Sequence, residues 1–217
     1  MSTRERRDRS NNFDRELSQL FQASVDKNKV DATSVALAAV GGFGRGELSP
    51  GSDLDLTILH DGKVKNLEAF VNDFLYPLWS QGIPIDHSVR TIKELDEVIH
   101  NDLRVILGLL DIRFLTGNRN LVEEVENFSK ALWQKNIRKY LPKIKETINE
   151  RTQRSGELAF LLEPDLKEAR GGLRDANLLR AISSSGITTV PLERVSEAEV
   201  RLQNVRDVLH TLSLIHI

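Results

Sequence analysis

Residues 41 to 59 read Gly41-Gly42-Phe43-Gly44-Arg45-Gly46-Glu47-Leu48-Ser49-Pro50-Gly51-Ser52-Asp53-Leu54-Asp55-Leu56-Thr57-Ile58-Leu59. A glycine-rich segment here runs into an apolar one that opens with two aspartates, Asp53 and Asp55. Because side chains alternate between the faces of a strand, both would project to one side, about 6.5–7 Å apart. Their ionised carboxylates repel each other unless a cation compensates the charge. The pattern predicts a strand that begins with a pair of metal-binding acids.

Two acids in this arrangement are typical of a nucleotidyltransferase. Two-metal sites hold their divalent cations roughly 3.5–4 Å apart, where the ions align the attacking oxygen and neutralise the leaving phosphate. Asp53 and Asp55 are the predicted catalytic residues and metal ligands. In the alternative interpretation they are solvated charges at a strand end, and the glycines form an ordinary tight turn.

The glycines ahead of the aspartates suit a turn that binds phosphate. Glycine reaches positive φ and lets backbone N–H groups come close to a triphosphate. The apolar run from Val35 to Val40 predicts a buried strand that leads into this turn. A Walker-type loop would need Gly-Lys-Ser/Thr, which is absent, and the dinucleotide-binding Gly-x-Gly-x-x-Gly fingerprint does not fit. The predicted nucleotide-binding residues are Gly41, Gly42, Gly44, Arg45 and Ser52.

Residues 41 to 56 resemble the nucleotidyltransferase motif of the polymerase-beta-like superfamily, and specifically that of the PII-protein uridylyltransferase family. Two later stretches are similar to the same family in the same order. They are residues 87 to 91, His-Ser-Val-Arg-Thr, and residues 162 to 175, Leu-Glu-Pro-Asp-Leu-Lys-Glu-Ala-Arg-Gly-Gly-Leu-Arg-Asp. The resemblance spans roughly residues 35 to 211.

The resemblance implies an activity and a partner. Members transfer UMP from UTP to a tyrosine of the PII signalling protein of nitrogen regulation, release pyrophosphate, and use Mg²⁺ or Mn²⁺. Actinobacterial relatives transfer AMP from ATP, and the sequence leaves the base open. Longer members also carry a nucleotide-removing HD domain and glutamine-sensing ACT domains, for which 217 residues leave no room. We therefore expect at most the forward transfer from this chain.

A third carboxylate is also implied by the superfamily resemblance. Residues 83 to 90 are expected to form the third strand of a small mixed sheet. Such a strand often supplies a metal ligand, which sometimes also serves as base toward the incoming hydroxyl, and Asp86 is the candidate in this sequence. The family pattern often has an acidic residue where Pro84 stands here, so an ordinary strand-end aspartate is the alternative.

The fold class expected from these motifs is α+β, with a small mixed-sheet nucleotidyltransferase core followed by an α-helical domain. Residues 1–12, rich in Arg, Ser and Asp, are expected to be a disordered tail, and residues 13–92 the core. Residues 93–211 would form an incomplete helical domain on the substrate side. Thr91-x-x-Glu94 predicts a helix start at the boundary between the two, and the apolar run from Leu103 to Leu115 predicts one buried helix that stops at Gly117.

The segment from Glu163 to Asp175 interrupts the helical run with a mixed charge cluster and two glycines. In the functional interpretation, Lys167, Arg170 and Arg174 oppose phosphate while the glycines let the backbone approach a nucleotide or a PII loop. The alternative is a connection between helices whose charges cap and pair locally.

The last six residues, 212–217, match an in-frame translation of a common transposon-end sequencing adapter (ctg tct ctt ata cac atc). We interpret them as an assembly artefact and exclude them from functional reasoning. The alternative is a genuine amphipathic helix end.

Composition excludes several other classes of function. Thirty basic and 32 acidic residues give a net charge of −2, so no global field indicates a nucleic-acid partner. The chain has no cysteine, which excludes disulfides and thiolate chemistry. No apolar stretch approaches 18 residues and no signal peptide is evident, so we expect no membrane association and a cytoplasmic location. Two alternative functions remain: a non-catalytic nucleotide-binding regulatory fragment and a small-molecule nucleotidyltransferase.

Overall fold

The computed structural model describes residues 2–100, 102–163 and 165–215. The chain divides into two compact units, and the boundary between residues 129 and 130 falls inside helix α6 (Arg119–Ser155). We call residues 2–129 the sheet unit and the part from Lys130 onward the helical unit. The expected domain boundary after residue 92 therefore differs from the structure, in which a further strand returns to the sheet beyond that point.

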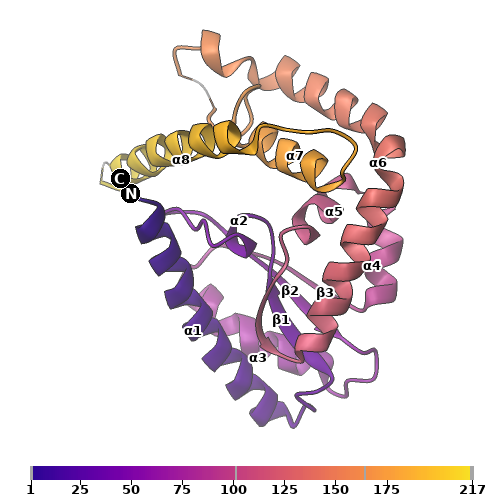
Figure 1. Ribbon diagram of the computed structural model, residues 1–217. Helices are drawn as coiled ribbons and strands as arrows, with labels where there is room; N and C mark the ends of the chain where they lie inside the picture. The colour runs from indigo at the N-terminus through magenta and orange to yellow at the C-terminus, as the bar shows by residue number, and fades with distance from the viewer. Residues whose placement is uncertain (1, 101, 164, 216–217) are drawn as a thin grey trace. The chain divides into compact units, whose positions relative to one another are not determined.

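One mixed sheet forms the centre of the sheet unit, and Figure 1 labels three of its strands. The strand order is β3-β2-β1-β4. Strand β1 (Val35–Ala39) pairs antiparallel with β2 (Leu54–His60) and with β4 (Arg113–Gly117), and β2 pairs parallel with β3 (Ile85–Arg90). Every residue of β1 is buried, which explains why its sequence is continuously apolar rather than alternating. The α+β class with a small mixed sheet is confirmed.

Strand β4 corrects the prediction of one helix from Leu103 to Leu115. The run splits into helix α5 (Leu103–Leu109), a turn and β4. A short apolar run fits a buried helix and a buried strand equally well, so periodicity alone does not separate them. The pairing with β1 decides the outcome, and Gly117 ends the strand so close to it that an added Cβ would lie 2.5 Å from the carbonyl oxygen of Val35.

Helices α1 (Thr3–Asn28) and α3 (Leu67–Ser80) pack together over the sheet residues that point into the core, such as Leu37, Leu56 and Ile58. Phe21 of α1 makes edge-to-face contacts with two rings of α3, at 5.1 Å from Phe70 and 5.7 Å from Phe74 between centroids. Figure 1 shows both helices beside the strands.

Helix α1 begins much earlier than expected. A disordered segment over residues 1–12 was the sequence-based expectation, but from Thr3 onward these residues are helical. The reason is a capping box, in which Ser2 and Glu5 satisfy each other's backbone N–H groups. Ser10 is buried, and its hydroxyl accepts a hydrogen bond from the backbone N–H of Leu48 at 3.3 Å. The N-terminal turns of α1 are therefore part of the sheet unit.

Replacing Ser10 with alanine is expected to lower the free energy of unfolding by about 1–2 kcal/mol, because the buried N–H of Leu48 loses its acceptor. Ser18→Ala is the matched control: both hydroxyls donate to a carbonyl of the preceding helical turn, at 3.0 Å from Ser10 and 2.6 Å from Ser18. Urea denaturation of the two variants measures the difference. Equal destabilisation by both would show that the Leu48 contact contributes nothing.

Two short helices complete the sheet unit. The predicted capping box of Thr91 and Glu94 is confirmed at the start of α4 (Ile92–Ile99), where each side chain bonds the other's backbone N–H. Helix α2 (Gly41–Gly44) is a single turn between β1 and β2. It contains three of the predicted nucleotide-binding glycines.

The helical unit contains most of α6, a short 3₁₀ turn (Leu158–Phe160), α7 (Leu173–Ser184) and α8 (Leu192–Ile215). Trp133 of α6 is fully buried, its indole donates to the carbonyl of Ala181 at 2.6 Å, and its ring stacks on Tyr140. Residues 216 and 217 lie outside the described residues, and so do the side chains from 213 onward. The adapter origin of residues 212–217 stays a prediction. In the described ranges, no helix is at once long and apolar enough to cross a membrane.

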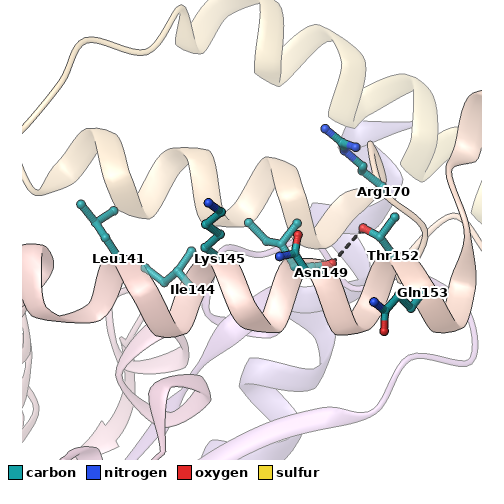
Figure 2. Close-up of a pocket in the computed structure, with 8 residues that line it drawn as sticks. Leu141, Ile144, Lys145, Asn149, Thr152, Gln153 and Arg170 are labelled. Atoms are coloured by element: carbon teal, nitrogen blue, oxygen red, sulfur yellow. Dashed lines mark hydrogen bonds between the residues drawn. The ribbon is translucent and has the colours of Figure 1, made fainter.

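A groove runs along α6 in the helical unit. Figure 2 shows its side chains projecting from successive turns between Leu141 and Gln153, with Arg170 from the following connection beside them. The hydroxyl of Thr152 donates within the helix to the carbonyl of Ile148 at 2.8 Å. The lining residues include Lys145 and Arg170 but no carboxylate, so the groove by itself offers no metal site.

Candidate active site

The sheet register places two of the three predicted acids next to each other. Asp55 on β2 and Asp86 on β3 are direct Cα partners in the parallel ladder. Directly paired residues of neighbouring strands, about 4.8 Å apart, share one face of a sheet. Asp53 is exposed and comes one residue before β2 starts. The two strands thus bring together acids that are 31 positions apart in the sequence.

The next pair along the same face holds this register. Thr57 and Ser88 are also direct partners, and their hydroxyl oxygens lie 3.2 Å apart within hydrogen-bonding distance. At the other end, the backbone N–H of Leu54 donates to the carbonyl of Pro84 at 2.9 Å. A slip of one residue would turn every side chain of the strand to the opposite face. The Asp55–Asp86 pairing is therefore tied to contacts on both sides of it.

The glycine turn passes directly beside Asp55. Gly41 has a φ of +56°, and a Cβ added to it would lie 3.1 Å from Oδ2 of Asp55. The backbone N–H of Val40 donates to the carbonyl of Asp55 at 3.0 Å. A side chain at position 41 would strain the backbone and crowd the carboxylate. The absence of a side chain at Gly41 therefore lets the turn lie directly against the carboxylate of Asp55.

Part of the turn's backbone is already engaged. The N–H groups of Gly44 through Glu47 donate to the carbonyls of Val40, Gly41, Phe43 and Gly42 at 2.9 to 3.1 Å. A phosphate would therefore have to use N–H groups earlier in the turn. At Gly42, an added Cβ would meet only Nη2 of Arg45, at 3.8 Å, which leaves open space on that side. Ser52, partly exposed, uses its own N–H to bond the carbonyl of Ser49 at 3.2 Å.

Gly44 faces inward rather than toward a ligand. It is buried, and a Cβ there would lie 1.9 Å from the carbonyl oxygen of Asp111 and 3.2 Å from that of Ala39. This glycine is required by the close approach of two backbone segments. Its position favours a packing role over the predicted contact with nucleotide.

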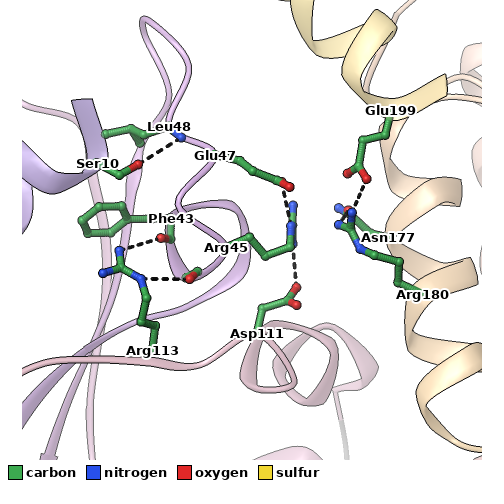
Figure 3. A network of polar contacts seen from close by, with 11 residues as sticks. Ser10, Phe43, Arg45, Glu47, Leu48, Asp111, Arg113, Asn177, Arg180 and Glu199 are labelled. Atoms are coloured by element: carbon green, nitrogen blue, oxygen red, sulfur yellow. Dashed lines mark hydrogen bonds and ion pairs between the residues drawn. The ribbon is translucent and has the colours of Figure 1, made fainter. Parts of the chain in front are cut away.

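The side chain of Arg45 also bonds other residues of the protein (Figure 3). Its Nε donates to Glu47 at 2.7 Å and its Nη1 to Asp111 at 2.6 Å, and its side chain is only 16% exposed. Burial acts to lower the pKa of Arg45, but the two carboxylates outweigh it and hold that pKa above its usual value. The guanidinium is thus a permanent cation that joins the turn to the segment before β4.

Sequence reasoning missed a second arginine at the turn. Arg113 on β4 donates from Nε to the carbonyl of Gly44 and from Nη2 to that of Phe43, both at 3.0 Å (Figure 3). Asp14 of α1 accepts from Nη1 at 2.5 Å and from Nη2 at 3.1 Å. No local spacing reveals this group, because Asp14 and Arg113 are 99 positions apart and β4 itself was not anticipated.

The carboxylates of Asp55 and Asp86 are chemically suitable ligands for a divalent cation. Carboxylate oxygens are the hard ligands that Mg²⁺ and Mn²⁺ prefer, and a cation would offset the repulsion between Asp55 and Asp86. Across the part of the chain that the structure describes, no three Asp, Glu, His or Cys side chains already converge as a metal site. The strand register brings Asp55 and Asp86 together, while Asp53 lies one residue before β2.

The charge cluster of the third motif pairs locally. Asp175 binds Arg151 and also accepts from the N–H of Gly171 at 2.7 Å. Arg174 bonds Glu168 at 2.5 Å, and Arg170 pairs with Glu157 at 3.4 Å. These contacts favour the alternative of a self-bonded connection between α6 and α7.

Gly172 supports the same interpretation of the third motif. A Cβ there would lie 2.7 Å from the carbonyl oxygen of Leu166 and 2.8 Å from that of Ala169. The glycine is therefore required by packing within the connection, and its backbone is not open to a ligand on that side.

Comparisons with known proteins find two family models and several named relatives that match this chain. Residues 17–108 match the family model of the nucleotidyltransferase domain, and residues 140–198 match the model described as GlnD PII-uridylyltransferase. Three relatives bear the name bifunctional uridylyltransferase/uridylyl-removing enzyme. The relative from Streptomyces coelicolor is 49% identical over 89% of this chain, that from Mycobacterium tuberculosis 39% over 84%, and that from Corynebacterium glutamicum 34% over 81%.

The fold and the domain match identify a nucleotidyltransferase domain in this chain. The second model and the relatives are more specific, and the chain belongs to the PII-uridylyltransferase family. It spans about a quarter of the length of these relatives, because the matched segments cover 23%, 24% and 25% of them.

Proposed function

We propose that this chain carries out forward nucleotidyl transfer, from a nucleoside triphosphate to a tyrosine of a PII signalling protein in nitrogen regulation. The observation that carries the proposal is the pairing of Asp55 with Asp86 beside the turn at Gly41. The names of the relatives favour UTP as the donor, and ATP is the alternative. A cytoplasmic location is part of the proposal, since nucleoside triphosphates are made and kept there.

The proposed roles follow from where each residue lies. Asp55 and Asp86, with Asp53, would hold Mg²⁺ or Mn²⁺, which when bound supplies positive charge against the triphosphate. Gly41 and Gly42 would approach the phosphates through the backbone, with Ser52 near the start of β2. Gly44 and Arg45 shape the turn from inside, and their proposed role is structural rather than direct contact with the nucleotide.

In the proposed reaction, the tyrosine oxygen attacks the α-phosphorus in line with the departing pyrophosphate. The new bond joins the phenolic oxygen to phosphorus, the bond between the α-phosphorus and its bridging oxygen breaks, and the bridging electrons leave with pyrophosphate. Asp86 is exposed at the strand edge and is the proposed acceptor of the phenolic proton. Fixed geometry and electrostatics supply most of the rate.

A transfer assay tests the proposal. The full chain is incubated with a PII protein, Mg²⁺ and either labelled UTP or labelled ATP, and tryptic peptides are analysed by mass spectrometry. We expect UMP or AMP on one PII tyrosine, loss of the label when EDTA removes the metal, and no label on a PII variant whose acceptor tyrosine is phenylalanine.

Other outcomes identify the alternatives. Nucleotide binding without any transfer would support a non-catalytic regulatory module and contradict the proposal. Label on a small hydroxyl compound in place of PII would support a small-molecule nucleotidyltransferase.

A further inference from the structure

We propose that Arg113, anchored by Asp14, is a positioning residue that fixes the glycine turn in the shape that binds the triphosphate. The inference rests on the proposed function for what the turn binds, but the contacts that carry it are independent of any ligand. They join three elements that are far apart in sequence: α1, the turn at α2, and β4.

The first observation is how Arg113 bonds the turn. Its guanidinium donates to two consecutive carbonyls, those of Phe43 and Gly44, and lies over the Phe43 ring with 5.4 Å from Cζ to the centroid. The rigid fork of arginine matches this pair of carbonyls, of which that of Phe43 also accepts from the N–H of Gly46 at 3.0 Å. Because Arg113 uses only carbonyl oxygens, it does not compete with a phosphate for the N–H groups of the turn.

The second observation is how Arg113 itself is held. Both carboxylate oxygens of Asp14 accept from it, and Asp14 lies on α1 one turn before the fully buried Leu17. The backbone of Arg113 pairs with Ala39, the last residue of β1. The arginine thus joins the turn to two elements fixed by the core, and only 32% of its side chain is exposed.

The third observation is that the glycine-rich turn needs contacts that restrict its backbone. Four of the six residues from 41 to 46 are glycine, the residue that loses most conformational freedom on folding. A site that binds triphosphate in a reactive geometry requires its donors to be fixed beforehand, and a shift of about 1 Å costs up to about 100-fold in rate. Hydrogen bonds within the turn restrict part of its backbone, and Arg113 adds a restraint from outside at two successive peptides.

The test compares Arg113→Met, Arg113→Lys and Asp14→Asn with the wild-type chain. Asp73→Asn is the matched control, since it alters another partly exposed ion pair between α1 and its neighbour, that of Lys27 and Asp73 at 2.8 Å, which does not touch the turn. Two measurements are made on each variant: calorimetric affinity for UTP and ATP with Mg²⁺, and hydrogen exchange of the amides of residues 44 to 47.

We expect Arg113→Met to weaken nucleotide binding about 10- to 100-fold and to speed exchange of these amides about tenfold or more. Arg113→Lys keeps the positive charge but lacks the planar guanidinium, so its nucleotide affinity and amide exchange should resemble those of Arg113→Met. Asp14→Asn should change both in the same direction but by less. Asp73→Asn should leave both at wild-type values. If Arg113→Met fails to fold, nucleotide affinity and amide exchange of Asp14→Asn test the positioning role instead.

The possible failures are distinguishable. Nucleotide affinity and amide exchange unchanged in the Arg113 and Asp14 variants would overturn the positioning role. A wild-type chain that binds neither UTP nor ATP would contradict the proposed function, while the exchange measurement would still decide whether Arg113 fixes the turn. A lower thermal stability with both readouts unchanged would reduce Arg113 to an ordinary structural ion pair.

Discussion

Replacing Asp55 with asparagine is expected to lower nucleotidyl transfer by about 1,000-fold or more while the chain keeps its fold. Asparagine has nearly the same shape as aspartate but carries no charge, so the site loses half of the negative pair that Asp55 and Asp86 form across the two strands. The backbone bond from Val40 goes to the carbonyl of residue 55 and survives the change. A loss of activity with an unchanged melting temperature is the expected signature.

Asp61→Asn is the control for this experiment, because it makes the same chemical change just beyond the other end of β2. Asp61 accepts from the Ser34 hydroxyl and the Lys63 N–H and lies in a turn. Its variant should transfer nucleotide at close to the wild-type rate. Near-normal transfer by Asp55→Asn would remove the basis of the proposed metal site.

Replacing Gly44 with alanine is expected to destabilise the sheet unit by about 2–3 kcal/mol, or about 5–10 °C in melting temperature. The new methyl group would overlap the carbonyl oxygen of Asp111 at 1.9 Å, and both partners are backbone segments that cannot rotate away. Thermal unfolding followed by circular dichroism measures the effect.

Gly42→Ala separates packing from binding at the same turn. Here the added methyl group meets only the end of Arg45 at 3.8 Å, so stability should stay within about 1 kcal/mol of the wild type. Nucleotide affinity should fall nonetheless, because the methyl group occupies the side from which a phosphate would approach. Equal loss of stability in both variants would contradict the division of roles between the two glycines.

Local features of the sequence predicted the central elements correctly. The apolar run of β1, the alternation of β2 and the capping box at Thr91 each depend on residues within a few positions of one another. The same is true of the glycine turn between the strands, which the structure places beside Asp55. Motifs of this kind also carried the resemblance to the uridylyltransferase family, which the comparisons confirm.

Other features were missed or left open for a common reason. The sequence of β4 predicts the end of a helix, because an apolar segment forms a strand only when a neighbour such as β1 offers hydrogen bonds. The polar composition of residues 1–12 predicts a tail, whereas in the structure the Ser2–Glu5 capping box starts α1 there. Arg45 was assigned to phosphate because its partner Asp111 is 66 positions away.

The sequence by itself determined that this chain has a nucleotidyltransferase core, since a glycine turn followed by alternating acids on a strand is specified by neighbouring residues. Only the tertiary structure decided which acids lie together and which glycines and arginines serve packing. The pairing of Asp55 with Asp86, the approach of Asp111 to Gly44 and the bonds of Arg113 to the turn all join distant segments. Strand register and core packing set these distances, and neither is encoded in the spacing of residues along the chain.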